Sequence, residues 1–175
     1  MMHFHNPLAR FGLVLCLVFS LAACDSSGTD DDGDGPGGAP LGNGSVAITG
    51  DIQTSIEGGA VYYVFEDGGL GLTIADVDFT TIEGNEDLPD EYLAVETSLV
   101  PAVGTITIDR DEEVYVEFNR PEGDLYATSG TIDITEVTDE RVVGTITAEV
   151  RLSSDLATTA GQMTASFEAL RLPGE

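Results

Sequence analysis

The sequence predicts an all-β protein with one folded domain, an antiparallel β-sandwich or barrel-like sheet of about 8–10 strands. Apolar residues occupy every second position of residues 144–152, the pattern of a strand with one buried and one solvated face. Runs rich in Val, Ile, Thr and Tyr are separated by short polar or glycine-bearing turns. No stretch shows the long 3.6-residue periodicity of an amphipathic helix.

The first 23 residues have the pattern of an export signal. A polar start carries one fixed positive charge, Arg10, and is followed by an apolar run at residues 11–21. This run has about half of the ~20 apolar residues that a membrane-spanning helix needs. Two small residues, Ala22 and Ala23, then precede Cys24. We therefore expect residues 1–23 to be removed on export.

The segment Leu21-Ala22-Ala23-Cys24 resembles the lipobox of bacterial lipoproteins. The resemblance implies cleavage between Ala23 and Cys24 and attachment of a diacylglycerol to the thiol of Cys24. Two or more acyl chains hold a protein stably on a membrane, whereas one chain binds marginally. The resemblance thus implies a lipid-anchored protein of the cell envelope, and we favour the outer membrane, on its periplasmic or surface face. An ordinary secretory signal or a short membrane anchor is the alternative.

Residues 24–44 predict a disordered acidic tether behind the lipidated cysteine. After Cys24 they hold seven glycines, five aspartates and two prolines, so they cannot bury enough apolar surface to offset ordering. Asp30, Asp32 and Asp34 match the opening of an EF-hand calcium loop, but Leu41 stands where the bidentate glutamate belongs. We expect a solvated tether rather than a metal site.

Residues 45–175 form the predicted domain, which is long enough for one hydrophobic core. Because open sheet edges invite aggregation, its strands must pack as two sheets or close into a barrel, and we favour the sandwich slightly. Gly58-Gly59 is interpreted as a break between strands, and residues 153–161 as a loop in which 155–160 could form one helical turn. Strands are predicted at 45–56, 60–66, 70–79, 92–100, 103–109, 113–119, 124–128, 130–137, 142–152 and 162–171.

The C-terminal third predicts the core most clearly. Two Gly-Thr-Ile strands joined by the polar turn 138–141, and a last strand with Ser166-Phe167-Glu168, resemble small envelope lipoproteins of unknown function. That resemblance implies no activity. Alternation assigns these residues to the inner face: Ile132, Ile134, Ile146, Ala148, Val150, Leu152, Met163, Ala165, Phe167 and Ala169.

Charge excludes one class of partner. The chain has no lysine, and removal of residues 1–23 would leave five arginines against 32 acidic residues. Such a surface repels nucleic-acid phosphates, so we expect no nucleic-acid binding. It fits either a protein adapted to high salt, where repulsion is screened, or one with a cationic partner or divalent ions. The absence of every lysine favours a halophilic surface.

Most catalytic and metal chemistry is also excluded for the processed chain, which would contain no histidine, no lysine and no cysteine except Cys24. Ser-His-Asp, Schiff-base, zinc and haem sites all need at least one of these side chains. Paired carboxylates could still support glycoside hydrolysis, but no pair stands out. We expect no enzyme activity, no cofactor and no metal. A second acidic cluster, at Glu83, Glu86, Asp87, Asp90 and Glu91, is interpreted as a solvated loop.

Aromatic residues offer one further candidate site. Alternation puts Tyr63 and Phe65 on one face of a strand and Tyr62 on the other, so at least one ring should be half exposed. Such rings could form a sugar-stacking face, but cross-strand packing in the core is favoured. Tyr92, Tyr115 and Tyr126 could likewise join a sugar-stacking face, and for them too packing in the core is favoured.

The sequence therefore favours a lipid-anchored, non-catalytic interaction or structural module that contacts an unknown envelope protein. The alternatives are a small-ligand, carbohydrate or calcium-binding β domain and, third, a carboxylate-based hydrolase. An unfilled apolar barrel interior would favour a ligand-binding protein. A filled core with an exposed apolar patch of roughly several hundred Å² would favour an interaction module.

Overall fold

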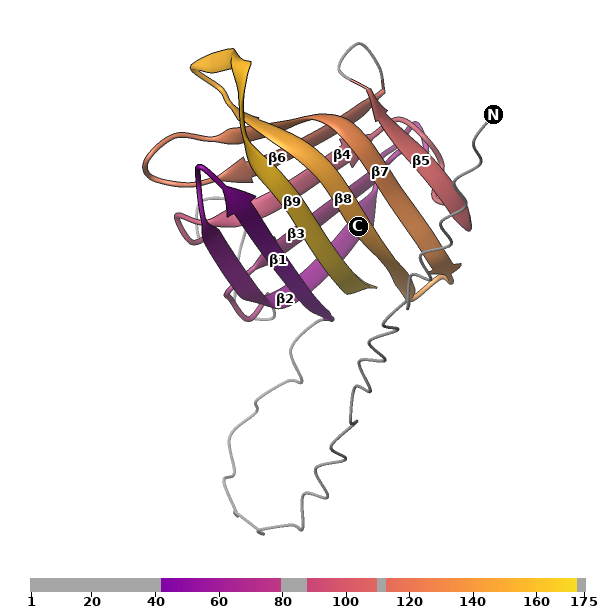
Figure 1. The fold of residues 1–175 in the computed structure, drawn as a ribbon. Coiled ribbons are helices and arrows are strands. Elements are labelled where there is room, and N and C mark those ends of the chain that lie inside the picture. Colours follow the sequence, from indigo (N-terminus) through magenta and orange to yellow (C-terminus); the bar gives the residue numbers. More distant parts are fainter. Residues whose placement is uncertain (1–41, 80–87, 110–112, 173–175) are drawn as a thin grey trace, which may run out of the picture. The chain divides into compact units, whose positions relative to one another are not determined.

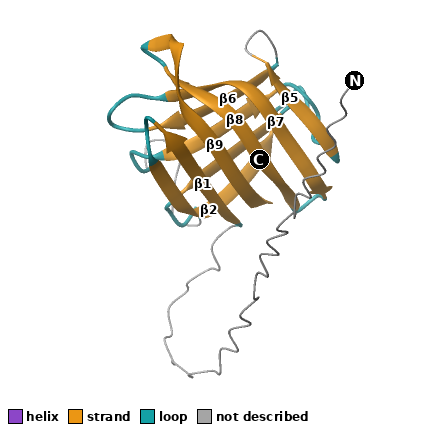
Figure 2. Cartoon of the chain, viewed as in Figure 1, coloured by secondary structure: helices purple, strands orange, loops and turns teal. Residues whose placement is uncertain are grey.

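The computed structural model describes residues 42–79, 88–109 and 113–172, which contain nine strands and no helix (Figures 1 and 2). The export signal, the lipobox with Cys24, the tether aspartates and the first three acids of the 83–91 cluster lie outside the described residues. The strands are β1 (Asn43–Gly50), β2 (Thr54–Val64), β3 (Leu70–Ala75), β4 (Tyr92–Thr97), β5 (Gly104–Asp109), β6 (Val114–Asn119), β7 (Leu125–Val137), β8 (Arg141–Leu152) and β9 (Asp155–Arg171).

Eight of these strands close into a barrel. The sheet order is β5-β7-β6-β4-β3-β2-β1-β9-β8, and β8 pairs back with β7. The all-β prediction is confirmed, but the slight preference for a sandwich is wrong, because one continuous sheet curls round and joins itself (Figure 1). Closure gives each of these eight strands a neighbour on both sides and leaves β5 as the edge strand.

The long strand β7 makes closure possible. Its 13 residues pair with β8 along one edge from Leu125 to Val137. Along the other edge it pairs first with β6 and then, from Ser129 to Ile134, with β5. Strand β5 is therefore an extra strand that lies beside β7 where β6 has diverged.

The end of β9 adds a second contact with β2. Where β1 begins, β9 continues past it and pairs directly with β2, in parallel, through Leu170 and Arg171. The backbone N–H of Leu172 then donates to the carbonyl of Tyr62 at 2.9 Å. Gly42 lies at this junction with φ 64°, and a Cβ there would lie 2.2 Å from the carbonyl oxygen of Ala60. Only glycine meets both demands without strain.

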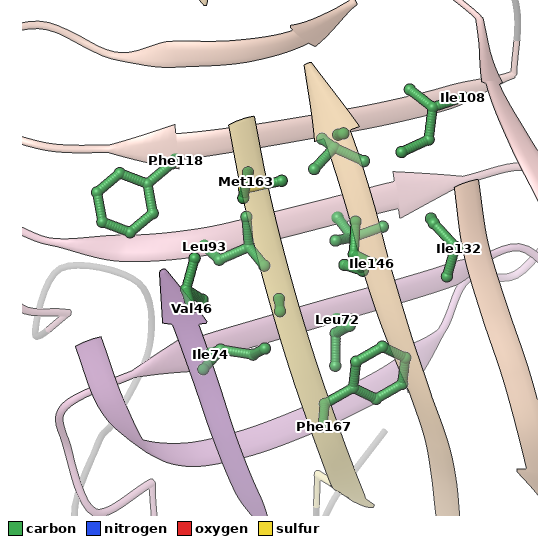
Figure 3. Close-up of a cluster of buried hydrophobic side chains, with 14 of the residues drawn as sticks. Val46, Leu72, Ile74, Leu93, Ile108, Phe118, Ile132, Ile146, Met163 and Phe167 are labelled. Carbon is green, nitrogen blue, oxygen red and sulfur yellow. The ribbon is translucent and has the colours of Figure 1, made fainter. Parts of the chain in front are cut away.

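Side chains fill the barrel interior (Figure 3). Phe118, Leu93, Ile74 and Leu125 have no exposed surface, and Met163 is 1% exposed. An eight-stranded barrel is just wide enough for such side chains to fill it. The predicted inner face is confirmed: Ile132, Ile134, Ile146, Ala148, Val150, Met163, Ala165, Phe167 and Ala169 are buried, and Leu152 packs against the core.

A second, smaller apolar cluster lies outside the barrel. Val61, Ala75 and Phe79 form its buried centre, and Tyr92 and Leu172 pack against it. The segment after β3 thereby covers the outer face of β2, so that Val61 is buried although its neighbour Tyr62 points into the core. This cover explains why β2 departs from strict alternation.

Several predicted strand boundaries are wrong for identifiable reasons. The run at 45–56 is a hairpin, because β1 ends at Gly50, whose φ is 133°. Gly58-Gly59 is not a break: Gly58 pairs with Gly44 and Gly59 with Ala75, deep inside β2. The two strands predicted at 124–137 are one strand with a bulge after Ala127, and residues 155–160 belong to β9.

Candidate functional site

The outer face of β1, β8 and β9 is a polar surface of small hydroxyl side chains. Thr131, Thr147 and Thr164 are register neighbours on β7, β8 and β9. In the next row Thr145 pairs with Ser166, whose Oγ lies 2.9 Å from that of Ser45 on β1. These side chains are mostly exposed, and the hydroxyl of Thr131 donates to Oδ2 of Asp133 at 3.3 Å.

An open groove of about 880 Å³ crosses this hydroxyl surface near the start of β1. Ser45, Thr145 and Ser166 line it, as do the acidic residues Glu57 and Asp76. Val77, Val143 and Phe167 also line it, so the groove combines hydroxyl, acidic and apolar side chains.

A different surface forms on the outer face of β2, β3, β4 and β6. Tyr63, Gly71, Glu96 and Tyr115 are consecutive register neighbours across these four strands. Gly71 has no side chain, and the ring of Tyr63 occupies the space above it: a Cβ at position 71 would lie 2.1 Å from Cζ of Tyr63. The sheet therefore presents a tyrosine on each side of one carboxylate, that of Glu96.

Two aromatic pairs extend this row. The rings of Tyr63 and Phe65 meet edge to face, with centroids 5.1 Å apart and an interplanar angle of 87°. The rings of Tyr115 and Tyr126 lie 5.4 Å apart, and the hydroxyl of Tyr115 donates to Oε2 of Glu117 at 2.9 Å. Partial burial, together with the hydrogen bonds to Tyr126 and Glu117, raises the pKa of Tyr115, so its hydroxyl keeps its proton.

A shallow, open cavity of about 360 Å³ has Phe65 and Tyr115 among its lining residues. Three acidic residues also line it, Asp67, Glu96 and Glu113, and no described arginine does. The cavity therefore combines two aromatic residues with three acidic ones. Its remaining lining residues are Thr97 and Ser98.

Backbone hydrogen bonds hold the walls of this cavity in place. Oδ1 of Asp67 accepts a bond from the N–H of Gly69 at 3.1 Å, which orders the turn between β2 and β3. The N–H of Ser98 donates to the carbonyl of Glu113 at 3.2 Å and ties the end of β4 to the start of β6. The site is thus built on neighbouring strand ends rather than on a long loop.

Exposed apolar side chains gather beside the cavity. Among described residues, the large hydrophobic side chains classed as exposed are Phe65, Leu99, Val100, Val103 and Tyr115, and Val100 and Val103 are 69% and 67% exposed. Val100 packs near the β2–β3 turn, with Cγ2 3.3 Å from a Cβ built at Gly68. We call this surface the aromatic–acidic face; it comprises Tyr63, Phe65, Asp67, Glu96, Leu99, Val100, Glu113 and Tyr115.

The preference for core packing of the aromatic residues is right for two of them and wrong for four. Tyr62 is 3% exposed and donates to the carbonyls of Thr138 and Asp139 at 3.2 and 3.0 Å. Tyr92 packs in the outer cluster. The other four, Tyr63, Phe65, Tyr115 and Tyr126, lie on the outer surface, where the sequence could not show that strands far apart in the chain bring them together.

Arg141 and Arg151 form ion pairs with acidic residues elsewhere on the barrel. Arg141 bonds Glu136 at 2.8 Å and Glu168 at 2.9 Å, and these two carboxylates raise the pKa of its guanidinium. Arg151 pairs with Glu149 at 2.7 Å and thereby lowers the pKa of that carboxyl. Within the described part of the chain, Asp67, Glu96 and Glu113 form no ion pair with an arginine.

The described residues also bear on metal binding and membrane spanning. Residues 42–79, 88–109 and 113–172 contain no group of three or more His, Cys, Asp or Glu side chains arranged to hold a metal ion. Of the predicted acidic cluster at 83–91, only Asp90 and Glu91 are described. No helix among these residues is long and apolar enough to cross a membrane.

Comparison with known proteins gives no relative: the chain matches no protein-family model, no curated protein and no solved structure. The case for function therefore depends on the side chains of this chain alone.

Proposed function

We propose that this protein is a lipid-anchored, non-catalytic interaction module of the cell envelope. The observation that carries the proposal is the aromatic–acidic face, where exposed Phe65, Tyr115 and Val100 accompany acidic residues on a barrel whose interior is filled. Apolar side chains that cluster on a surface and are rimmed by polar residues mark interaction sites. On a chain this acidic, such a patch is the surface best suited to contact another protein.

The filled interior argues against a ligand held inside the barrel. Barrels that carry small molecules keep an apolar cavity among the inward side chains. Here Phe118, Leu93 and Leu125 occupy the centre with no exposed surface. A carbohydrate or other polar ligand remains the second candidate, and the observation that favours it is the open groove lined in part by hydroxyl side chains.

The anchor follows from the lipobox resemblance and the composition of the tether. A flexible coil of about 20 residues has a mean end-to-end distance of roughly 25 Å. The tether would therefore hold the barrel away from the lipid headgroups, which its charge would otherwise repel. We propose attachment to the outer membrane through acyl chains on Cys24, with the acidic surface as an adaptation to salt.

Lipidation is tested by metabolic labelling of cells with an alkyne analogue of palmitate. We expect label in the wild-type protein and in the control Cys16→Ser, whose cysteine lies inside the export signal. Cys24→Ser should lose the label and leave the membrane fraction. Label that persists without Cys24, or a wild-type protein that carries none, would refute the anchor.

A further inference from the structure

We infer that the aromatic–acidic face binds an extended, cationic and apolar segment of a partner protein, with a guanidinium or ammonium group seated in the cavity that Phe65 and Tyr115 line. The inference rests on the proposed function as an interaction module and names the chemistry of the partner. It is carried by the cavity of about 360 Å³, the charge around it and the apolar side chains beside it.

The cavity has the composition of a cation site. Cations are attracted to the faces of aromatic rings, and guanidinium or ammonium groups form short, charge-assisted hydrogen bonds with carboxylates. Phe65 and Tyr115 supply the rings, and Asp67, Glu96 and Glu113 supply the carboxylates. An arginine side chain suits this lining especially well, because its planar group both stacks on rings and bonds carboxylates in pairs.

The surroundings of the cavity suit apolar side chains of the same segment. Leu99, Val100 and Val103 lie on the connection from β4 to β5 and are exposed, and burying them would add hydrophobic stabilisation to the charge contact. Interfaces commonly combine an apolar centre with a charged rim in this way.

The same connection leads into a strand edge. Strand β5 pairs with β7 on one side, and no other described strand pairs with its second edge. Strand β5 contains Thr105 and Thr107 but no lysine and no proline, the residues that commonly prevent another strand from pairing with an exposed edge. An extended partner segment could therefore add backbone hydrogen bonds to β5 while its side chains cover Val103.

Charge selects against other occupants. The chain's own tether carries five aspartates and no basic residue, so the carboxylates of the cavity would repel it. A second copy of this chain, docked through the same face, would place its Glu96 and Glu113 against the same residues of the first copy, and these like charges would repel. Anionic lipid headgroups would be repelled in the same way. A cationic segment of a different protein is the occupant that satisfies both the rings and the carboxylates.

The test measures peptide binding to the full chain, purified in detergent, by fluorescence anisotropy at 0.5 M NaCl. At this salt concentration the screening length is about 4 Å, which suppresses general attraction to the acidic surface. The probe is an eight-residue peptide that alternates arginine with valine. Its matched control replaces arginine with citrulline, which keeps the shape and removes the charge. We expect the arginine peptide to bind at least tenfold more tightly.

Two pairs of variants locate the binding. Glu96→Gln with Glu113→Gln should weaken binding of the arginine peptide at least tenfold, because both carboxylates line the cavity. Glu57→Gln with Asp76→Asn removes the same charge from the open groove and should change affinity less than twofold. Val100→Ser, at a side chain 69% exposed, should weaken binding several-fold without disturbing the fold. Circular dichroism confirms that each variant remains folded.

Three results would overturn the inference. If both pairs of charge-removing substitutions weaken binding of the arginine peptide equally, the peptide is attracted by the acidic surface in general. If the citrulline peptide binds as tightly as the arginine peptide, docking is apolar and needs no cation. Self-association that Val100→Ser abolishes would make the face an interface between copies of this chain. None of these readouts depends on the acyl chains, so failure here is separate from failure of the lipid anchor.

Discussion

Phe118 on β6 lies directly opposite Leu125 on β7, and neither side chain has any exposed surface. This pair and the neighbouring pair of Glu117 and Tyr126 make up the register between β6 and β7. By comparison, β7 and β8 pair along nearly their whole length. Closure of the barrel therefore depends on a short seam in which one apolar pair supplies most of the burial.

We expect Leu125→Ala to destabilise the protein by about 2–5 kcal/mol, because it removes a buried side chain and leaves a cavity at the seam. The control Val103→Ala, at a side chain 67% exposed, should change the free energy of unfolding by less than about 0.5 kcal/mol. Urea denaturation followed by circular dichroism measures both. A Leu125→Ala cost below about 1 kcal/mol would mean that the seam does not hold the barrel closed.

A second prediction concerns Tyr63 and Gly71, whose contact shapes the aromatic–acidic face. Gly71→Ala would put a Cβ 2.1 Å from the ring of Tyr63, so the ring must move away. We expect a loss of about 1–3 kcal/mol, typical of overpacking. In a Tyr63→Ala background the same substitution should cost less than about 0.5 kcal/mol, since the clash is gone. Equal costs in both backgrounds would show that the ring does not occupy this space.

A third prediction is sensitivity to alkali. Burial raises the pKa of Tyr62 and of Tyr92 in the folded protein above the ordinary value of about 10, and Tyr115 is shifted in the same direction. A raised folded pKa favours the neutral form, so this stability is fully present below pH 10 and is lost as pH rises from there through the folded pKa. Because the chain has no tryptophan, tyrosinate absorbance reports the titration directly. Titration midpoints near pH 10 for all tyrosines of the folded protein would contradict this prediction.

Tyr62→Phe isolates one of these groups. It removes the hydroxyl that donates to the carbonyls of Thr138 and Asp139 but keeps the ring in the core. We expect a loss of about 1 kcal/mol near pH 7, the usual net value of a hydrogen bond. Above pH 10 the variant should lose less further stability than the wild type. A parallel loss in both proteins would place the alkaline sensitivity elsewhere.

A fourth prediction separates salt adaptation from cation binding. If the acidic surface is an adaptation to salt, molar NaCl and KCl should raise the melting temperature equally, because both screen repulsion among like charges. Millimolar CaCl₂ at constant ionic strength should then add nothing. A large upward shift with millimolar calcium would indicate a specific site by ligand linkage and would refute the expectation of no metal.

The candidate site was only partly predictable. Alternation correctly put Tyr63 and Phe65 on one face with Tyr62 opposite, and it required a half-exposed ring. It gave no means of joining Phe65 to Tyr115, which lie 50 positions apart in the sequence and meet through β3 and β4. Likewise, Gly58-Gly59 looked like a break because glycine favours turns, but its pairing with Gly44 and Ala75 keeps it in β2.

The sequence by itself determined the strand content, the inner face of the C-terminal strands and the acidic, lysine-free surface. These properties are local or compositional: side chains alternate along any strand, so period-two patterns identify faces before the strand partners are known. Tertiary structure alone decided that the sheet closes, that β5 remains outside the closed circuit and that four aromatic rings share the outer surface. Closure depends on which distant strands pair, and that choice is made by packing among side chains far apart in the chain.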